Sequence, residues 1–171
     1  MNLFDNELTR ALKTKKQNEK DGICMNFIGD IDSLPKTLQT LINKTKSEKK
    51  ETTRTVSTIA INYGSQQEIL NATKQIHKDI SNEKINVDNF EAADFNKYLY
   101  TAQMPPVDLM IRTGGEKRLS NFLLWQSAYA ELYFTDVYWP DFSTDELDKA
   151  IISYANRNRR FGDVKEDKFE S

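Results

Sequence analysis

The sequence predicts an α/β fold with a mostly parallel sheet flanked by helices. Short runs of apolar and β-branched residues alternate with segments whose apolar residues recur at helical spacing. The chain has 171 residues, of which 38% are hydrophobic, and this suits one domain with a sizeable core. Because ligands of such sheets gather beyond the carboxyl ends of the strands, we expect a binding site in the loops that follow them.

The elements of the first half follow from their residue patterns. The stripe of Leu3, Phe4, Leu8 and Leu12 predicts a helix over Met1–Lys16. The later elements are a buried strand over Ile23–Gly29, a helix that starts near Pro35, a charged surface connection over Lys44–Arg54, a β-branched strand over Thr55–Asn62, and a helix from Tyr63–Ser65 to about His77.

The second half continues the alternation of helices and strands. Residues Ile85–Tyr100 predict one or two short helices, which end before Pro105 and Pro106. The elements that follow are a strand over Val107–Arg112 with Thr113–Glu116 as its exit loop, a helix over Ser120–Ala130, a strand over Leu132–Asp136, a helix over Thr144–Asn158, and a polar tail over Asp163–Ser171.

Charge and composition exclude several classes of protein. The formal net charge of −2 provides no general attraction to nucleic acid and at most a peripheral contact with membranes. A single cysteine, Cys24, excludes an intrachain disulfide framework, and a single histidine, His77, excludes a site with several histidine ligands. Because there is neither a secretory segment over residues 1–20 nor an apolar run of about 20 residues, we expect a cytoplasmic protein.

The densest group of chemistry-bearing residues follows the third predicted strand. Arg112 ends the strand, Gly114 and Gly115 allow close backbone approach, and Arg118 and Ser120 lead into a predicted helix. Two guanidinium groups, free backbone N–H groups and a hydroxyl at a helix start could cradle a phosphate or diphosphate. A glycine turn flanked by surface salt bridges explains the same residues equally well.

Further charged and aromatic residues have ordinary structural interpretations as well. Glu131 could help bind Mg²⁺ against diphosphate oxygens, or it is a plain helix-end carboxylate. The cationic segment Arg157–Gly162 could cap the last helix, with its glycine as the stop. Trp125 and Trp139 are expected to pack in the core rather than to form a stacking platform.

The most specific feature of the sequence is a set of three segments in its second half. They are Arg112–Gln126 (RTGGEKRLSNFLLWQ), Ala128–Phe142 (AYAELYFTDVYWPDF) and Asn156–Gly162 (NRNRRFG), and they are preceded by FIGD, INYG and YTA segments. Together they resemble the cis-prenyltransferase family, in particular the undecaprenyl diphosphate synthases. The resemblance covers residues 1–162 as one domain and leaves residues 163–171 as a tail.

The resemblance implies a transferase that condenses isopentenyl diphosphate with an allylic prenyl diphosphate. It implies Mg²⁺ as cofactor and a polyprenyl (undecaprenyl) carrier lipid for cell-wall synthesis as product. It places isopentenyl diphosphate on Arg112, Arg118, Ser120, Arg160 and Gly162, with Glu131 as a Mg²⁺-related residue. Because the terminal RxG motif of the family reaches the partner's active site, we expect a homodimer or a heterodimer with a catalytic homologue.

The sequence also departs from the family pattern. The MDGNGRWA-like segment, with its essential aspartate, and the later YAFSSENW-like segment do not occur, Gln66 replaces a usual arginine, and Lys117 stands where a histidine often occurs. We therefore expect a shortened form without the first strand, the early helices and the catalytic aspartate, which argues against activity of the isolated chain. The alternatives are a non-catalytic partner subunit that donates its RxG motif, and a decayed product.

Overall fold

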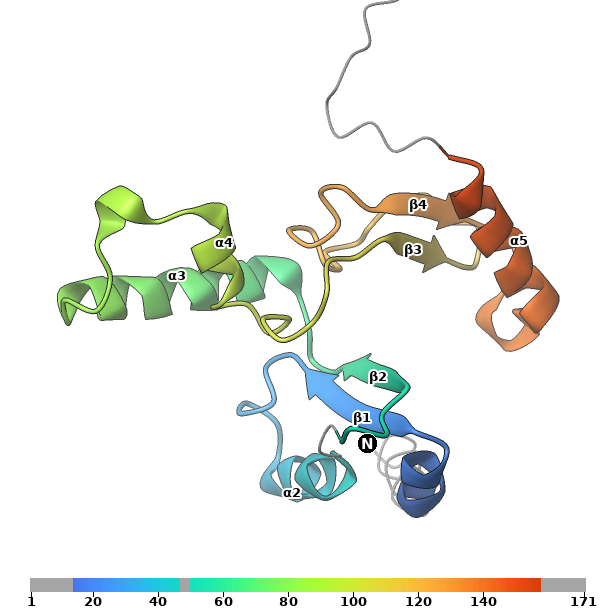
Figure 1. The fold of residues 1–171 in the computed structure, drawn as a ribbon, viewed down its shortest axis with the longest axis horizontal. Coiled ribbons are helices and arrows are strands. Elements are labelled where there is room, and N and C mark those ends of the chain that lie inside the picture. The colour runs from blue at the N-terminus through green and yellow to red at the C-terminus, as the bar shows by residue number, and fades with distance from the viewer. Residues whose placement is uncertain (1–13, 47–49, 158–171) are drawn as a thin grey trace, which may run out of the picture. The chain divides into compact units, whose positions relative to one another are not determined.

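The computed structural model describes residues 14–46 and 50–157. The chain divides into two compact units, Met1–Met104 and Pro105–Ser171. Among the described residues, each unit contains one pair of parallel strands, β1–β2 in the first and β3–β4 in the second (Figure 1). The prediction of an α/β fold with parallel strands and flanking helices is confirmed.

The core of the first unit lies between its strands and one helix. Strand β1 (Ile23–Ile28) pairs in parallel with β2 (Thr55–Ala60), and α2 (Lys36–Thr45) lies along one side of the pair (Figure 1). Pro35 occupies the N-cap of α2, where its fixed φ and missing N–H are tolerated. The buried side chains that pack together here are Met25, Phe27, Leu38, Ile42 and Ile61.

The other described elements of the first unit are helices. Helix α3 (Ser65–Ser81) extends four residues beyond the predicted end at His77, and it is followed by η1 (Val87–Asn89) and α4 (Ala92–Asn96), which confirms the prediction of short helices. Residues 14–20 are helical as well. The apolar stripe from Leu3 to Leu12, which predicted that helix, lies outside the described residues.

The second unit is built on the other strand pair. Strand β3 (Leu109–Arg112) pairs with β4 (Glu131–Phe134), and α5 (Thr144–Ala155) lies beside them (Figure 1). The Ser143 side chain caps α5 by accepting a hydrogen bond from the Glu146 N–H. A short turn of helix, η2 (Trp139–Asp141), precedes α5.

The prediction of a helix over Ser120–Ala130 is wrong. The segment forms successive turns, because Ser120, Asn121 and Leu123 have φ values of 49°, 63° and 47°, which a right-handed helix excludes. The expectation that both tryptophans are core residues is also wrong. Trp125 is 38% exposed and Trp139 is 74% exposed, and Trp139 stacks on Phe142 with ring centroids 6.1 Å apart.

The last helix ends earlier than predicted. Helix α5 ends at Ala155, and Asn156 caps it through hydrogen bonds from its N–H to carbonyl oxygens of the preceding turn. The predicted tail, Asp163–Ser171, lies outside the described residues. Of the helices in the described ranges, none combines the length and apolar character that crossing a membrane requires.

Candidate diphosphate-binding site

Arg112 organises the loop that follows β3. It is the last residue of the strand and lies opposite Phe134 in the β3–β4 register. Its guanidinium Nη1 donates to Ser120 Oγ at 2.8 Å and also to the carbonyl oxygen of Arg118. The structure therefore brings Arg112 and Ser120, two of the predicted site residues, into direct contact across the loop.

Arg118 has a different partner. Its guanidinium forms a salt bridge with the Glu116 carboxylate, and the two side chains are 62% and 52% exposed. An exposed pair of this kind contributes little to stability, so an incoming anion can replace Glu116 at small cost. A diphosphate offers the guanidinium the same planar, charge-assisted hydrogen bonds that the carboxylate provides.

The two glycines of the loop have a conformational role. Gly114 and Gly115 have φ values of 84° and 78°, in the region that favours glycine. The Gly114 N–H donates to Val137 O and the Gly115 N–H donates to Thr135 O, both at 2.9 Å. The expectation that these backbone N–H groups are free for a phosphate is therefore wrong, because the strand-exit segment of β4 accepts both.

The expected helix N-terminus at Ser120 does not form. Ser120 is an exposed turn residue with positive φ, and the following residues do not continue as a helix. A helix dipole therefore does not contribute to anion binding at this position. The side chains of Arg112, Arg118 and Ser120 remain the predicted candidates for anion binding in this loop.

Glu131 lies away from this loop within the chain. It is the first residue of β4, opposite Leu109, whereas Arg112 is opposite Phe134 at the other end of the pair. The separation of three register positions corresponds to about 10 Å along the strands, and alternation directs the two side chains to opposite faces. The Glu131 Oε2 instead accepts a hydrogen bond from Arg157 Nη1 at 2.7 Å.

These contacts test whether the chain fits a Mg²⁺ site. In the described ranges, no group of three or more His, Cys, Asp or Glu side chains converges on a common point. Glu131 is a single carboxylate already paired with a guanidinium, and it does not face the diphosphate that Arg112 would hold. A Mg²⁺ ion shared by Glu131 and an anion on Arg112 of the same chain does not fit this arrangement.

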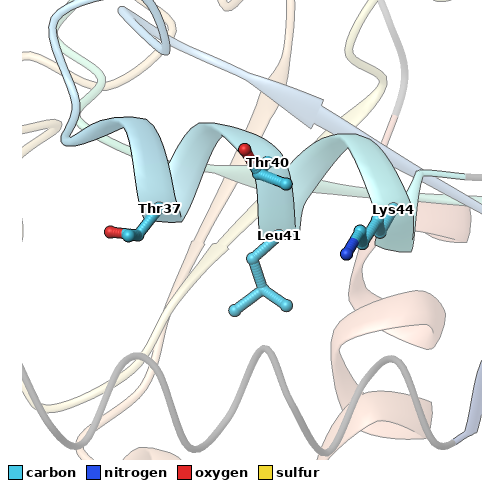
Figure 2. A pocket seen from close by; sticks show the side chains of 4 residues that line it. All are labelled: Thr37, Thr40, Leu41 and Lys44. Carbon is cyan, nitrogen blue, oxygen red and sulfur yellow. The ribbon is translucent and has the colours of Figure 1, made fainter.

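The two remaining predicted site residues, Arg160 and Gly162, lie outside the described residues. A hollow of about 350 Å³ opens on α2, where it is lined by Thr37, Thr40, Leu41 and Lys44 (Figure 2). All four side chains come from one helix, and only Lys44 is cationic. These four described residues therefore do not supply the several converging donors that a diphosphate needs.

In the first unit, parallel pairing of the strands brings together the loops that follow them. The Asn62 side chain, which follows β2, donates to Asp30 O at 3.0 Å and to Ser33 Oγ at 2.8 Å. The Asp30 N–H in turn donates to Asn62 O at 3.2 Å. The loops after β1 and β2 are thus joined at one edge, as the parallel pairing predicted.

Sequence reasoning missed a buried carboxylate beside these loops. Glu68 on α3 is 1% exposed, and its Oε1 accepts the Tyr100 N–H at 2.7 Å. The Tyr100 hydroxyl accepts a hydrogen bond from Asn71 Nδ2 at 2.9 Å. The signal in the sequence was weak: Glu68 lies one residue before Ile69 on the predicted apolar face, and a glutamate there is ordinarily solvated.

Comparison with known proteins places the chain in a family. The family model of undecaprenyl diphosphate synthases matches residues 1–162. The chain is 46% identical over 162 residues to a ditrans,polycis-undecaprenyl-diphosphate synthase of Haemophilus influenzae, and the match covers 95% of this chain and 66% of that protein. It is 49% identical over 144 residues to a tritrans,polycis-undecaprenyl-diphosphate synthase of Picrophilus torridus, with coverages of 84% and 56%.

A solved structure agrees with the sequence matches. Lavandulyl diphosphate synthase of Lavandula x intermedia, determined with dimethylallyl diphosphate, superposes with a TM-score of 0.82 at 32% identity, over 95% of this chain and 70% of that one. The chain spans less than two thirds of the length of each curated relative above. Because the family model covers residues 1–162, the chain belongs to the undecaprenyl diphosphate synthase family, whose members are prenyltransferases.

Proposed function

We propose that the loop after β3 binds isopentenyl diphosphate, and that the chain takes part in its condensation with an allylic prenyl diphosphate. The observation that carries the proposal is the contact of Arg112 Nη1 with Ser120 Oγ at 2.8 Å. It supports a preformed arrangement in which a guanidinium and a hydroxyl act on one anion. The curated relatives, which are named as polycis-undecaprenyl-diphosphate synthases, support the choice of substrate.

The proposed roles follow from the chemistry of each side chain. Arg112 contacts the loop through Nη1. Its guanidinium carries further N–H groups, which can donate hydrogen bonds to a diphosphate oxygen. Ser120 is exposed, and its hydroxyl can rotate to donate to the same anion. Arg118 exchanges Glu116 for a phosphate oxygen. These contacts would hold the five-carbon substrate in a fixed orientation. Binding then removes the translational and rotational entropy that the reaction would otherwise lose in its transition state.

The proposed reaction uses that orientation. The double bond of the isopentenyl unit attacks C1 of the allylic substrate, the C1–O bond breaks and inorganic diphosphate leaves with its electron pair, and a proton is lost from the isopentenyl unit. We infer that Mg²⁺ accompanies the diphosphates, because their oxygens are the ligands this ion prefers. Arg160 and Gly162 as further substrate contacts, a dimeric state and a polyprenyl carrier-lipid product are part of the same proposal.

The binding half of the proposal is tested by calorimetric titration of the full chain with isopentenyl diphosphate in Mg²⁺ buffer. We expect Arg112→Ala to weaken binding by about ten- to a hundredfold, as loss of a charged hydrogen-bond partner implies. Arg54→Ala, which removes an exposed arginine from the first unit, is the matched control and should leave the affinity unchanged. Equal affinities for the unsubstituted chain and Arg112→Ala would show that the loop does not hold the ligand.

Turnover is a separate measurement. The chain is incubated with isopentenyl diphosphate, Mg²⁺ and farnesyl diphosphate or geranylgeranyl diphosphate, the allylic substrates in the names of the two relatives. Mass spectrometry then detects any product that is longer by five-carbon units. Product formation that Arg112→Ala abolishes supports the proposal. Binding of isopentenyl diphosphate without any product would restrict the proposed function to binding of this substrate.

A further inference from the structure

A carboxylate of the loop after β3 occupies one of the two guanidinium groups that the proposed function uses. Glu116 Oε2 accepts a hydrogen bond from Arg118 Nη1, and the two exposed side chains form a salt bridge. A carboxylate and a phosphate present oxygens of the same kind to a guanidinium. The N–H group that Glu116 accepts therefore becomes available to a phosphate oxygen only when the pair opens.

The backbone of Arg118 is held independently of its side chain. Arg112 Nη1 donates to the carbonyl oxygen of Arg118 and to Ser120 Oγ. The Arg118 guanidinium can therefore change its partner while Arg112 and Ser120 keep their contact. Opening of the Glu116–Arg118 pair is a change of two exposed side chains in a loop that stays in place.

We propose that Glu116 is an internal competitor of the ligand, which takes the place of a phosphate group on Arg118 and so lowers the affinity of the loop for diphosphates. The inference rests on the proposed function, in which Arg118 binds a phosphate oxygen. The apparent affinity of a ligand falls with the fraction of molecules in which its binding group is free. An exposed ion pair of ordinary strength lowers it by about two- to fivefold.

A moderate affinity suits the proposed reaction. The isopentenyl unit keeps its own diphosphate when it joins the allylic chain, so the lengthened product carries that diphosphate on the loop. A further isopentenyl diphosphate binds there only after this group has left, and product release limits the turnover of many enzymes. Because Glu116 competes for Arg118 with any diphosphate, it weakens the binding of substrate and product alike.

The inference is tested by calorimetric titration of the full chain in Mg²⁺ buffer, once with isopentenyl diphosphate and once with inorganic diphosphate. Glu116→Gln keeps the size of the side chain and removes its charge, so it should tighten the binding of both ligands by about two- to fivefold. Unchanged or weaker binding by Glu116→Gln overturns the inference, and weaker binding assigns the carboxylate to orienting Arg118 or holding Mg²⁺. A gain for isopentenyl diphosphate alone overturns it too, because the competition concerns phosphate oxygens.

General repulsion between Glu116 and the anion would produce the same gain, and two variants separate the explanations. Arg118→Gln removes the guanidinium, so adding Glu116→Gln to it should no longer change the affinity. Asp136→Asn removes another carboxylate beside the loop and leaves the Glu116–Arg118 pair intact. The Asp136 Oδ1 lies 3.2 Å from the position that a Cβ on Gly115 would occupy. For the competitor role, Asp136→Asn should tighten binding less than Glu116→Gln does.

A gain that persists without Arg118, or an equal gain in Asp136→Asn, shows general repulsion and overturns the inference. If Arg118→Gln binds too weakly for titration, the comparison with Asp136→Asn decides alone. The proposed function fails in a different way, because it is overturned when neither the unsubstituted chain nor Glu116→Gln binds. Binding by the unsubstituted chain that Glu116→Gln does not tighten overturns the inference alone, and binding by Glu116→Gln alone supports both.

Discussion

The Tyr63 hydroxyl donates a 2.5 Å hydrogen bond to Oε2 of Glu68, a glutamate that is 1% exposed. The other carboxylate oxygen accepts the backbone N–H of Tyr100 at 2.7 Å. One side chain thus joins the turn after β2, helix α3 and the segment at residue 100. A buried carboxylate with partners from three segments holds them together only while all its hydrogen bonds are made.

We expect Glu68→Ala to lower the free energy of unfolding by about 3 kcal/mol, because it leaves the half-buried Tyr63 hydroxyl and Tyr100 N–H without their acceptor. Glu68→Gln keeps the volume and one acceptor, so it should cost less, and Tyr63→Phe should cost about 1.5 kcal/mol. Urea denaturation followed by circular dichroism measures all three. A loss below about 1 kcal/mol for Glu68→Ala would show that water replaces the carboxylate.

Gly29→Ala should prevent folding or cost at least about 3 kcal/mol. Gly29 follows β1 with φ at 119°, and a Cβ built there lies 1.9 Å from the Ile61 carbonyl oxygen, which is backbone and cannot move aside. Gly64→Ala is the control, because Gly64 has φ at −150°, an extended conformation that any residue adopts. The yield of folded protein and the urea midpoint report the difference, and equal stabilities of the two variants would contradict the clash.

Ser127→Ala should stabilise the chain by about 1 kcal/mol. Within the described ranges the Ser127 Oγ is buried and has no hydrogen-bond partner, so alanine removes an unsatisfied polar group at little loss of packing. The same substitution at Ser143 should cost about 1 kcal/mol, because Ser143 Oγ accepts the Glu146 N–H at the start of α5. The test is the sign of the change in stability. The midpoint of thermal unfolding should rise for Ser127→Ala and fall for Ser143→Ala, and a shift in the same direction for both variants contradicts this assignment.

The loss of folding stability at acidic pH should depend on Asp94. The Lys97 ammonium, 2.7 Å from Asp94 Oδ1, lowers the pKa of the Asp94 carboxyl, and the Glu91 N–H adds to this. A carboxyl whose pKa is lower in the folded state stabilises the fold above its unfolded pKa, and this contribution is lost as the pH falls below about 4. Asp94→Asn should therefore show a smaller loss of stability between pH 7 and pH 3 in urea titrations.

Lys97→Gln provides the matched comparison for that titration. It removes the larger cause of the lowered pKa and keeps the hydrogen bond from the Glu91 N–H to Asp94 Oδ2 at 3.1 Å. Its pH dependence should lie between those of the unsubstituted chain and Asp94→Asn. If the free energy of unfolding of Asp94→Asn depends on pH as that of the unsubstituted chain does, other carboxyl groups control the loss of stability at acidic pH.

Most elements of the fold could be predicted because their signals are local. The β-branched run of Thr55–Asn62 predicted β2, and Pro35 with the apolar spacing of Leu38 and Ile42 predicted α2. The segment Ser120–Ala130 could not be predicted in this way. Its apolar residues have helical spacing, but the backbone conformations of Ser120, Asn121 and Leu123 are those of turns.

The sequence by itself determined the family, the alternation of strands and helices, and which charged residues follow β3. The order of the residues along the chain is enough for this, because strand and helix signals are local and ligands of parallel sheets bind beyond the carboxyl ends of the strands. Only the tertiary structure decided the partners: Ser120 for Arg112, Glu116 for Arg118, and Arg157 for Glu131. Strand register and side-chain direction are set by packing between distant segments, and spacing along the chain does not contain them.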